Sequence, residues 1–209
     1  MITSKSGNLA EFVGLMLGDG NLYSQVSTGN YQIRIAFNLK EEYEYLFYVK
    51  NLALNLFNLS FYEKITKKEN VVHLCKSSKK LLKFLISIGI NKNKKIPNWI
   101  FKNKKYLKCC VRGLIDTDGS VFRMSNKDYR LIRIGFKNVN KKLLKNFRTA
   151  LIKLDFYPSK IICNRQIFLS RKDEIKRYVK EIGFNNPKNK KRFINLALSS
   201  SGQECLLNF

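Results

Sequence analysis

Two nine-residue stretches decide how this chain folds: FVGLMLGDG at residues 12–20 and VRGLIDTDG at residues 111–119. In each, two small residues stand four positions apart, Gly14 and Gly18 in the first stretch and Gly113 and Thr117 in the second. Small side chains at this spacing clear one ridge of a helix, so that two helix backbones can approach closely. A glycine inside a helix costs about 1 kcal/mol relative to alanine, and close packing would offset that cost. The stretches therefore predict two helices that pack against each other through these four residues.

The two stretches belong to a longer internal repeat. Residues 12–38 match residues 111–137, and residues 81–89 match residues 175–183. The tetrapeptide KNKK follows each copy, at 92–95 and at 188–191. Three matched blocks in the same order indicate one unit of about 100 residues duplicated head to tail. We expect an N-terminal half at 1–100 and a C-terminal half at 101–209, joined by an ordered basic connector at 91–105.

Each half predicts the same order of elements, helix-strand-strand-helix-strand-strand-helix (αββαββα), which is typical of an α+β fold with antiparallel sheets. In the first half, the sequence pattern predicts helices at 9–18, 41–56 and 78–88, and strands at 21–26, 31–38, 60–66 and 71–76. In the second half, it predicts helices at 107–117, 141–154 and 173–182, and strands at 120–124, 132–137, 159–164 and 166–170. Polar turns are expected at 27–30 and 125–128. Period-two alternation marks the core face of two strands: Tyr31, Ile33, Ile35, Phe37, Ile132, Ile134 and Phe136.

Charge and composition narrow the class of function. The 209 residues include 40 Lys and Arg against 15 Asp and Glu, a formal net charge of +25. This large positive charge favours a polyanionic partner, either nucleic acid or an anionic membrane. The sequence has no apolar run of about 18 residues, which a membrane span would need. It also has no evident export signal, so an intracellular protein is expected. The five cysteines have no metal-binding spacing, and His73, the single histidine, is predicted to be a strand residue satisfied locally.

The aspartate before the last glycine of each quoted stretch carries the chemistry. Asp19 and Asp118 occupy equivalent C-terminal ends of the paired helices, so they should lie side by side. A carboxylate there faces the negative pole of the helix dipole, and a second carboxylate adds repulsion. A divalent cation with oxygen ligands, Mg²⁺ above all, would relieve both effects. With phosphates supplied by a polyanion, metal-assisted phosphodiester hydrolysis is the predicted reaction.

These residues resemble a known family. VRGLIDTDG at 111–119 is very similar to the motif that names the LAGLIDADG homing endonucleases, and FVGLMLGDG at 12–20 is a looser copy. The resemblance covers nearly the whole chain and points to a two-motif, monomeric, pseudo-symmetric member. It implies that the two halves form a pseudo-twofold saddle, whose antiparallel sheets sit on double-stranded DNA. It further implies cutting of both strands across the minor groove of a long, rare site, which leaves 3′ overhangs.

The resemblance also assigns roles to residues. It implies that Asp19 and Asp118, with the adjacent Gly18 and Thr117, form the site for the catalytic Mg²⁺, which Mn²⁺ can replace. Asp116 lies elsewhere on its helix and is expected to be structural. Asn38 and Lys137 stand at matching strand ends and are candidates to order the attacking water, although local capping is an equal alternative for Asn38.

The KNKK repeats supply further candidates. The resemblance implies one lysine from each half near the scissile phosphates, and we favour Lys95 and Lys191; a solvated charge run is the alternative. Lys94 and Lys190 are expected to bind DNA phosphates. The residues expected on outward strand faces, where they could read bases in the major groove, are Gln32, Arg34, Arg123 and Arg133.

Two other functions remain open from the sequence. Some members of the family are RNA maturases that assist intron splicing, and the basic surface would also suit intron RNA. A non-catalytic DNA-binding regulator on the same fold is less favoured, because both aspartates are retained. The Met1 start and the absence of splice-block residues at the ends favour a free-standing or intron-encoded product over an excised intein segment.

Overall fold

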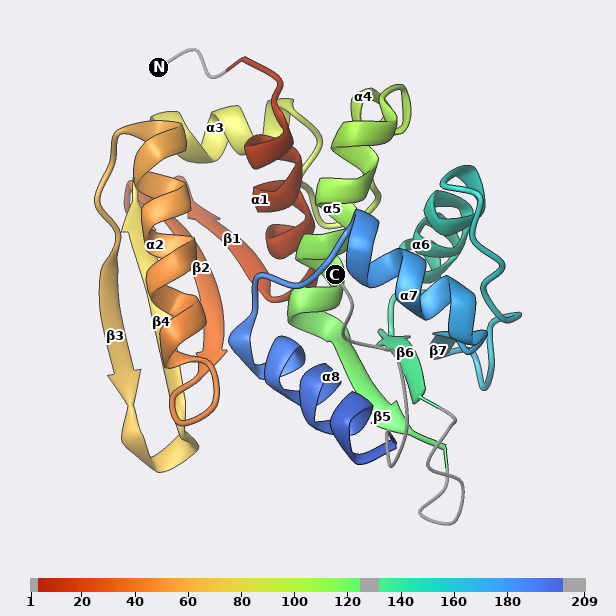
Figure 1. The fold of residues 1–209 in the computed structure, drawn as a ribbon. Helices are drawn as coiled ribbons and strands as arrows, with labels where there is room; N and C mark the ends of the chain where they lie inside the picture. Colours follow the sequence, from red (N-terminus) through yellow and green to blue (C-terminus); the bar gives the residue numbers. More distant parts are fainter. Residues whose placement is uncertain (1–3, 125–131, 201–209) are drawn as a thin grey trace.

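The computed structural model describes residues 4–124 and 132–200. In the first half, helices α1 (Gly7–Gly18), α2 (Tyr43–Phe57) and α3 (Lys79–Ser87) accompany strands β1 (Gly20–Gln25), β2 (Asn30–Asn38), β3 (Tyr62–Thr66) and β4 (Val71–Ser77). A 3-10 turn, η1 (Lys67–Glu69), connects β3 to β4. The strands form an antiparallel sheet in the order β1-β2-β4-β3, with helix α2 across one of its faces (Figure 1).

The second half repeats this plan with a smaller sheet. Helices α5 (Lys104–Asp118), α6 (Lys141–Lys153) and α7 (Lys172–Glu181) accompany strands β5 (Gly119–Arg123), β6 (Ile132–Lys137) and β7 (Gln166–Leu169). These strands form an antiparallel sheet in the order β5-β6-β7. The expected α+β fold with two antiparallel sheets is therefore confirmed. The predicted turn at 125–128 lies outside the described residues.

The predicted strand at 159–164 is wrong. This segment makes only one isolated bridge, from Ile162 to Gln166. Cys163 and Asn164 have φ angles of 49° and 54°, and this left-handed backbone turns the chain instead of extending it. The described residues of the second half therefore contain no counterpart of β3, and their order is not αββαββα.

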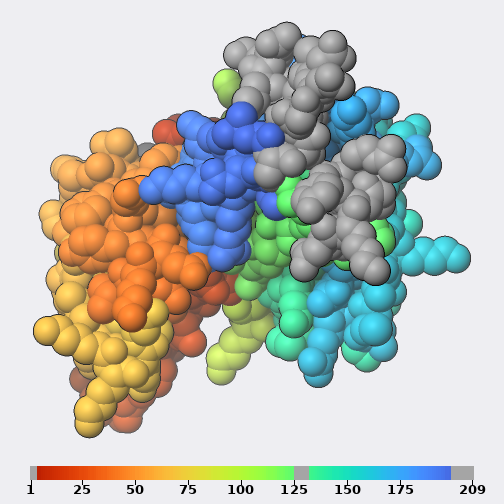
Figure 2. All heavy atoms as spheres, turned by 60° about the horizontal axis from the view of Figure 1, so that its bottom comes forward, coloured from red at the N-terminus to blue at the C-terminus, as the bar shows by residue number. Residues whose placement is uncertain are grey.

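Helix α8 (Pro187–Ser200) was not expected from the repeat. The Asn-Pro pair before the second KNKK starts it: proline favours the first helical position, and the Asn186 Oδ1 accepts a hydrogen bond from the Lys188 backbone N at 2.9 Å. The first KNKK forms a turn, in which Lys94 has a φ of 43°. The two KNKK copies are thus in different structures, and α8 runs between the two halves of the molecule (Figure 2).

Helix α4 (Asn98–Phe101) lies within the connector between the halves. The Trp99 indole Nε1 donates to the Ile88 carbonyl at 2.9 Å, and its ring meets that of Tyr106 at 5.7 Å. The connector is therefore ordered against both halves. Among the described residues, no helix is long and apolar enough to cross a membrane.

Side-chain caps fix where the central helices begin. The Ser6 Oγ accepts a hydrogen bond from the Leu9 N at 3.2 Å at the start of α1. The Asn103 Oδ1 accepts from the Lys105 and Tyr106 N atoms at the start of α5. Such caps satisfy amides that have no partner inside the helix, so the sequence sets the start of each helix.

The apolar alternation is confirmed for both halves. Ile33, Ile35 and Phe37 are buried on one face of β2. Ile132, Ile134 and Phe136 are buried on the matching face of β6. Tyr31 is only half-buried, at the end of the strand, where Lys79 Nζ lies 5.2 Å from its ring centroid.

Helices α1 and α5 pack directly against each other at the centre of the molecule (Figure 1). A Cβ added to Gly14 would lie 2.3 Å from the Cys110 carbonyl oxygen, and one added to Gly113 would lie 2.4 Å from the Glu11 carbonyl oxygen. A Cβ on Gly18 would meet the Thr117 side chain. All four small residues therefore lie in the contact between the helices.

A polar cluster seals the same interface. The Glu11 carboxylate is fully buried and pairs with the Arg112 guanidinium at 2.5 Å. The Tyr48 hydroxyl and the Asn185 amide also donate to Glu11, at 2.8 and 2.6 Å. Asp116 accepts from the Asn185 backbone N at 2.9 Å, which gives it the structural place expected. Residues of both halves thus satisfy one another's buried groups.

We expect Gly14→Ala and Gly113→Ala each to lower the free energy of unfolding by about 1–3 kcal/mol or more, because a backbone carbonyl occupies the space of the new methyl group. Thermal unfolding by circular dichroism measures the effect. The matched control is Gly29→Asn, at a glycine with a φ of 65° and open space around it, a conformation that asparagine tolerates. Equal melting temperatures for Gly14→Ala and the control would contradict the close helix contact.

Candidate active site at the ends of the paired helices

Two aspartates meet where helices α1 and α5 end. Asp19 caps α1, and its backbone N donates to the Leu15 carbonyl at 3.1 Å. Asp118 is the last residue of α5, and its Oδ2 lies 3.3 Å from the position of a Cβ on Gly18. Each is followed by a glycine that opens a strand, and a Cβ on Gly20 or Gly119 would strike the preceding turn of its helix at 2.5 or 2.4 Å. Glycine is therefore needed for each helix to turn directly into its strand.

Burial raises the pKa values of both carboxyl groups. Burial raises the pKa of Asp19 to about 7, with the negative charges of Asp118 and Glu42 adding to the effect and Lys94 and Lys188 opposing it. Burial also raises the pKa of Asp118, while a hydrogen bond from Asn138 and the charge of Lys94 lower it. Two partly buried acids held together in this way favour a bound cation.

The donor set suits a hard divalent cation. Two carboxylates are the ligands of choice for Mg²⁺ when substrate and water supply the other oxygens. No group of three or more His, Cys, Asp or Glu side chains able to hold a metal occurs in the described ranges 4–124 and 132–200. The residues present therefore fit Mg²⁺ shared with a phosphate-bearing substrate and do not fit a fully enclosed structural metal site.

Lys94 and Lys188 approach the aspartates from the two halves. The Lys94 Nζ donates to the Gly18 carbonyl oxygen at 2.8 Å, and its charge acts on both Asp19 and Asp118. The Lys188 Nζ donates to Glu42 at 2.5 Å and its charge acts on Asp19. Two cations thus flank the acids, one carried by a loop of the first half and one by helix α8.

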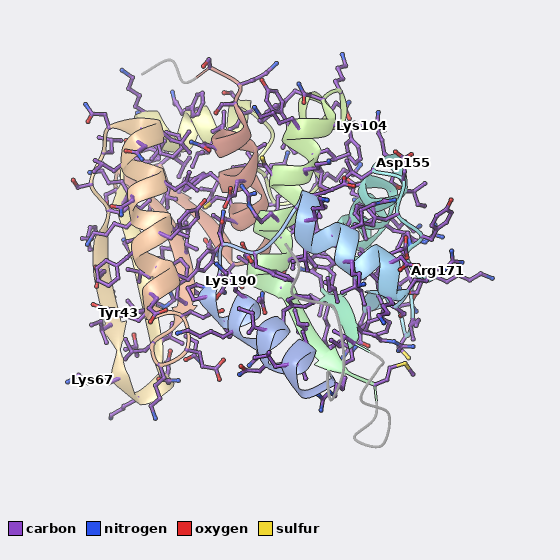
Figure 3. All side chains as sticks on the ribbon, in the orientation of Figure 1. Tyr43, Lys67, Lys104, Asp155, Arg171 and Lys190 are labelled. Carbon is purple, nitrogen blue, oxygen red and sulfur yellow. The ribbon has the colours of Figure 1, made fainter. Side chains whose placement is uncertain are left out.

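This placement differs from the one favoured by the sequence. Lys95 is exposed, and so are Lys190 and Lys191 on α8, where Lys191 Nζ lies 3.2 Å from Glu44. Lys190 lies near the start of that helix (Figure 3). Aligning the KNKK copies misses the match, whereas counting five residues from each positive-φ glycine, Gly89 and Gly183, finds Lys94 and Lys188.

Glu42 holds Lys188 in place. Its carboxylate is buried and accepts from the Asn38 backbone N at 3.0 Å, the Asn186 amide at 3.1 Å and Lys188. Asn186 is itself fully buried and also donates to the Asp116 carbonyl oxygen at 2.8 Å. The ion pair therefore joins a residue of the first half to a lysine of the second beside the acid pair.

Asn38 and Lys137, the two strand-end residues predicted to order the attacking water, have other positions in the structure. The Asn38 Oδ1 accepts from the Lys40 and Glu41 backbone N atoms, both at 3.0 Å, so it has a local role, in the turn before α2, although the N-cap of that helix is Glu42. Lys137 is exposed. The next residue, Asn138, donates to Asp118 through its Nδ2 at 2.7 Å and was missed because the repeat aligns Lys137, not Asn138, with Asn38.

Comparison with known proteins decides the family. The sequence pattern of the LAGLIDADG DNA endonuclease family matches residues 11–111, and that of a LAGLIDADG-like domain matches residues 107–183. The two matches lie in tandem and together span most of the chain. The chain belongs to the LAGLIDADG family of DNA endonucleases.

Solved structures agree with this LAGLIDADG assignment. A structure of mesophilic variants of the homing endonuclease I-DmoI has a TM-score of 0.61 at 20% identity, covering 85% of this chain and 95% of that one. I-SmaMI bound to uncleaved DNA in the presence of calcium ions has a TM-score of 0.61 at 9% identity, covering 94% and 91%. The chain thus has the fold of these two-domain proteins.

One curated relative is 33% identical over 119 residues, a DNA polymerase of Thermococcus hydrothermalis. That match covers 54% of this chain and 7% of the relative. The similarity therefore concerns one short segment of a much longer protein.

Beside the LAGLIDADG acids, the outward face of the first sheet forms an open cavity of about 470 Å³, lined in part by Asp19, Arg34, His73 and Lys94. Arg34 is held by Gln32, whose Oε1 accepts from the guanidinium Nε at 2.7 Å, and the Gln32 amide donates to the Tyr62 hydroxyl at 3.3 Å. Gln32 and Arg34 are thus on the outward face, as predicted.

His73 is a strand residue, as predicted, but among the described residues the local partner expected for its side chain is not found at Nδ1. It lies on β4 opposite Ala36, but its Nδ1 is buried without a hydrogen-bond partner in the described part of the chain. Because Ala36 has only a methyl group, the imidazole reaches the cavity.

The outward position predicted for Arg123 is also wrong. Arg123 lies two residues beyond the buried Val121, on the same face of β5, and its Nη2 donates to the Leu196 carbonyl of α8 at 3.3 Å. It therefore faces the helices. Arg133 lies on the outward face, as predicted, because it alternates with the buried Ile132 and Ile134.

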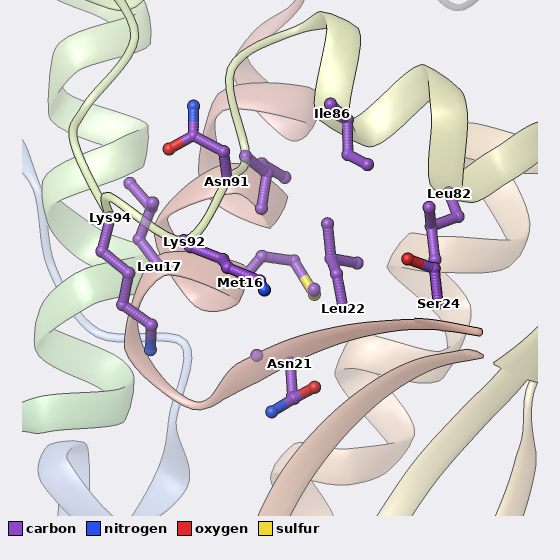
Figure 4. Close-up of a pocket in the computed structure, with 12 residues that line it drawn as sticks. Met16, Leu17, Asn21, Leu22, Ser24, Leu82, Ile86, Asn91, Lys92 and Lys94 are labelled. Carbon is purple, nitrogen blue, oxygen red and sulfur yellow. The ribbon is translucent and has the colours of Figure 1, made fainter. Parts of the chain in front are cut away.

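A second cavity, of about 350 Å³, lies behind β1 (Figure 4). Its walls are mainly apolar and come from the end of α1, β1, α3 and the loop that follows, with Met16, Leu22 and Ile86 among the lining residues. Lys94 lies at its edge and separates it from the acid pair. Gly20 and Asn21 also line both this cavity and the one beside the acids, so the two cavities are neighbours.

Metal affinity should depend on pH. Since Asp19 has a pKa of about 7 without metal and a cation binds the ionised form, we expect affinity for Ca²⁺ to fall as pH decreases from 8 to 6. Well below pH 7 the loss approaches about tenfold per pH unit from this group. Calorimetric titration measures it, and Asp155→Asn, at an exposed carboxylate ion-paired with Lys104 (Figure 3), is the matched control. A pH-independent affinity would show that Asp19 is not a ligand.

The lysine placement predicts which variants lose activity. Lys94→Met and Lys188→Met should each lower the rate of DNA cleavage about 100-fold, because each removes a cation from beside the reacting centre. Lys95→Met and Lys191→Met should change it less than about threefold, through phosphate contacts alone. Single-turnover cleavage separates the pairs, with the melting temperature as a check on folding. If Lys95→Met and Lys191→Met instead caused the larger losses, Lys95 and Lys191 would be the lysines that act at the scissile phosphates.

Proposed function

We propose that this protein is a monomeric homing endonuclease that hydrolyses both strands of a long, specific DNA site and leaves 3′ overhangs. The observation that carries the proposal is the pair Asp19 and Asp118, partly buried side by side where the two motif helices end, with Lys94 and Lys188 close by. One chain supplies both acids and both lysines, so a single copy forms the complete site. DNA as substrate implies that the protein acts inside the cell.

The cofactor in this proposal is Mg²⁺, with Mn²⁺ as a substitute. Asp19 and Asp118 would hold it, and Thr117 and Gly18 keep the two carboxylates adjacent by their small size. When bound, the metal activates water and stabilises the leaving oxygen. Structures of I-DmoI in complex with DNA and Mn, and with DNA and Ca, support divalent metal use on this fold.

The protein residues have separable tasks in the hydrolysis. Lys94 and Lys188 place positive charge beside the phosphate on which negative charge develops. Asn138 orients Asp118 through its 2.7 Å hydrogen bond. Glu42 fixes the Lys188 ammonium, so this lysine is held in place before substrate arrives.

The outward sheet faces supply affinity and specificity. Arg34, held in a fixed orientation by Gln32, can donate to base edges in the major groove. The net charge of +25 implies many phosphate contacts and a steep dependence of affinity on salt. Double-stranded DNA is therefore the proposed partner.

The test is cleavage of a plasmid that carries the uninterrupted insertion locus of the gene. With Mg²⁺ we expect one double-strand break with 3′ overhangs. Asp19→Asn and Asp118→Asn should each reduce cutting by at least about 10³-fold while binding persists, because the acids share the metal site.

Light scattering on the DNA complex should show one protein per duplex. Binding without cutting by the unaltered protein would contradict the endonuclease proposal, and intron RNA would then be the ligand to test. A fully active Asp19→Asn variant would contradict the shared site.

A further inference from the structure

The outward face of the second sheet carries an aromatic patch. Phe122 on β5 and Phe168 on β7 flank Arg133 and Gly135 on β6, on the face opposite the buried Ile134 and Phe136. The two phenyl rings meet edge to face with centroids 5.8 Å apart, and the Arg133 guanidinium lies 5.2 Å from the Phe168 ring centroid. Both rings are partly exposed and lie outside the hydrophobic core cluster.

Gly135 provides the space for this patch. A Cβ at that position would lie 2.9 Å from Phe122 Cε1 and 3.2 Å from Phe168 Cδ1. A Cβ at this position would push the Phe122 and Phe168 rings out of their present places, so glycine lets the two rings close over the central strand. The patch is therefore a specific arrangement of the second half.

The first half has different chemistry in the corresponding places. By the repeat, Phe122 matches Tyr23 and Gly135 matches Ala36. Phe168 lies opposite Gly135 as His73 lies opposite Ala36. Where the first sheet presents a hydroxyl and an imidazole, the second presents two phenyl rings that cannot form conventional hydrogen bonds.

We propose that the second half recognises thymine in its part of the DNA site through apolar contact of Phe122 and Phe168 with thymine methyl groups. This rests on the proposed function. A sheet in the major groove meets the edges of base pairs, and the C5 methyl of thymine is the apolar group displayed there. The first half reads its part of the site by hydrogen bonds, so recognition differs between the two halves.

The patch also has a defined distance from the cut. Strand β5 starts directly after Asp118, and Phe122 is four residues further along. At about 3.3 Å per residue this is roughly 13 Å, or about four base-pair steps of 3.4 Å. The recognised thymines therefore lie within about five base pairs of the cleavage centre.

The geometry favours duplex DNA over unpaired bases. Unpaired bases bind by stacking on open aromatic faces. Here the Arg133 guanidinium lies over the Phe168 ring, and Phe122 and Phe168 are edge to face. These contacts already occupy ring faces, so the ring edges remain free to contact DNA. A ring edge suits contact with a methyl group.

The test selects binding sites from two pools of random duplexes, one made with thymidine and one with deoxyuridine, which lacks the methyl group. The full chain is used with Ca²⁺ in place of Mg²⁺. We expect thymine to be enriched near the centre of one half-site only. Replacing each contacted thymine by uracil there should weaken binding about three- to fivefold, with no effect in the other half-site.

Variants assign the effect to the patch. Phe122→Tyr with Phe168→His gives the second half the residue types of the first and should abolish the difference between thymine and uracil. The reciprocal Tyr23→Phe with His73→Phe should leave the thymine preference of the second half-site intact, and Arg34→Ala identifies which half-site the first half binds. Gly135→Ala should weaken the preference by separating the rings.

Three results would overturn the inference. First, replacing thymine by uracil could leave binding unchanged at every position, while the protein still binds and cuts its site. The thymine inference would then be wrong, and the proposed function would remain. The thymine preference could persist in the Phe122→Tyr, Phe168→His variant. Enrichment of no duplex sequence from either pool would contradict both this inference and the proposed function.

Discussion

The close contact between helices α1 and α5 is the constraint on which the rest of the structure depends. Backbone carbonyls of one helix occupy the space where a Cβ would stand on Gly14 or Gly113 of the other. This short distance brings the helix ends together. It also brings together two carboxylates that repel each other when both are ionised. Helix packing and site chemistry are therefore one problem: the same glycines that let the helices approach also place Asp19 beside Asp118.

The protein offsets the resulting charge with groups drawn from both halves. Lys94 reaches the acids from a loop of the first half and Lys188 from the start of α8. Glu42 and Asn186 fix Lys188, and Asn138 fixes Asp118. Because each acid has different neighbours, the duplicated site is not symmetric. Burial still dominates and holds the pKa of Asp19 near neutrality, which suits a group that exchanges protons for a cation.

The two halves have diverged most at their sheets. The first keeps four strands and a hydrogen-bonding outward face, with Tyr62, Gln32 and Arg34 linked in a row. In the described residues the second sheet has three strands, and Cys163 and Asn164 turn the chain where a fourth was predicted. Its outward face carries phenyl rings, and α8 fills the space between the halves. A duplicated scaffold thus presents two different surfaces beside one pair of acids.

The sequence by itself determined the duplication, the paired helices, the α+β order of the first half and the meeting of Asp19 with Asp118. These follow from local rules, because glycine spacing and period-two alternation are written along the chain. It also raised the capping role of Asn38 as an alternative, since that role involves neighbours in sequence. Only the tertiary structure decided that Lys94 and Lys188 flank the acids, that Asn138 touches Asp118, that Arg123 faces the helices and that His73 reaches a cavity. Each of these depends on which distant segment packs against the residue. Two copies of KNKK with the same letters lie in a turn and in a helix, because Pro187 follows Asn186 in one copy alone.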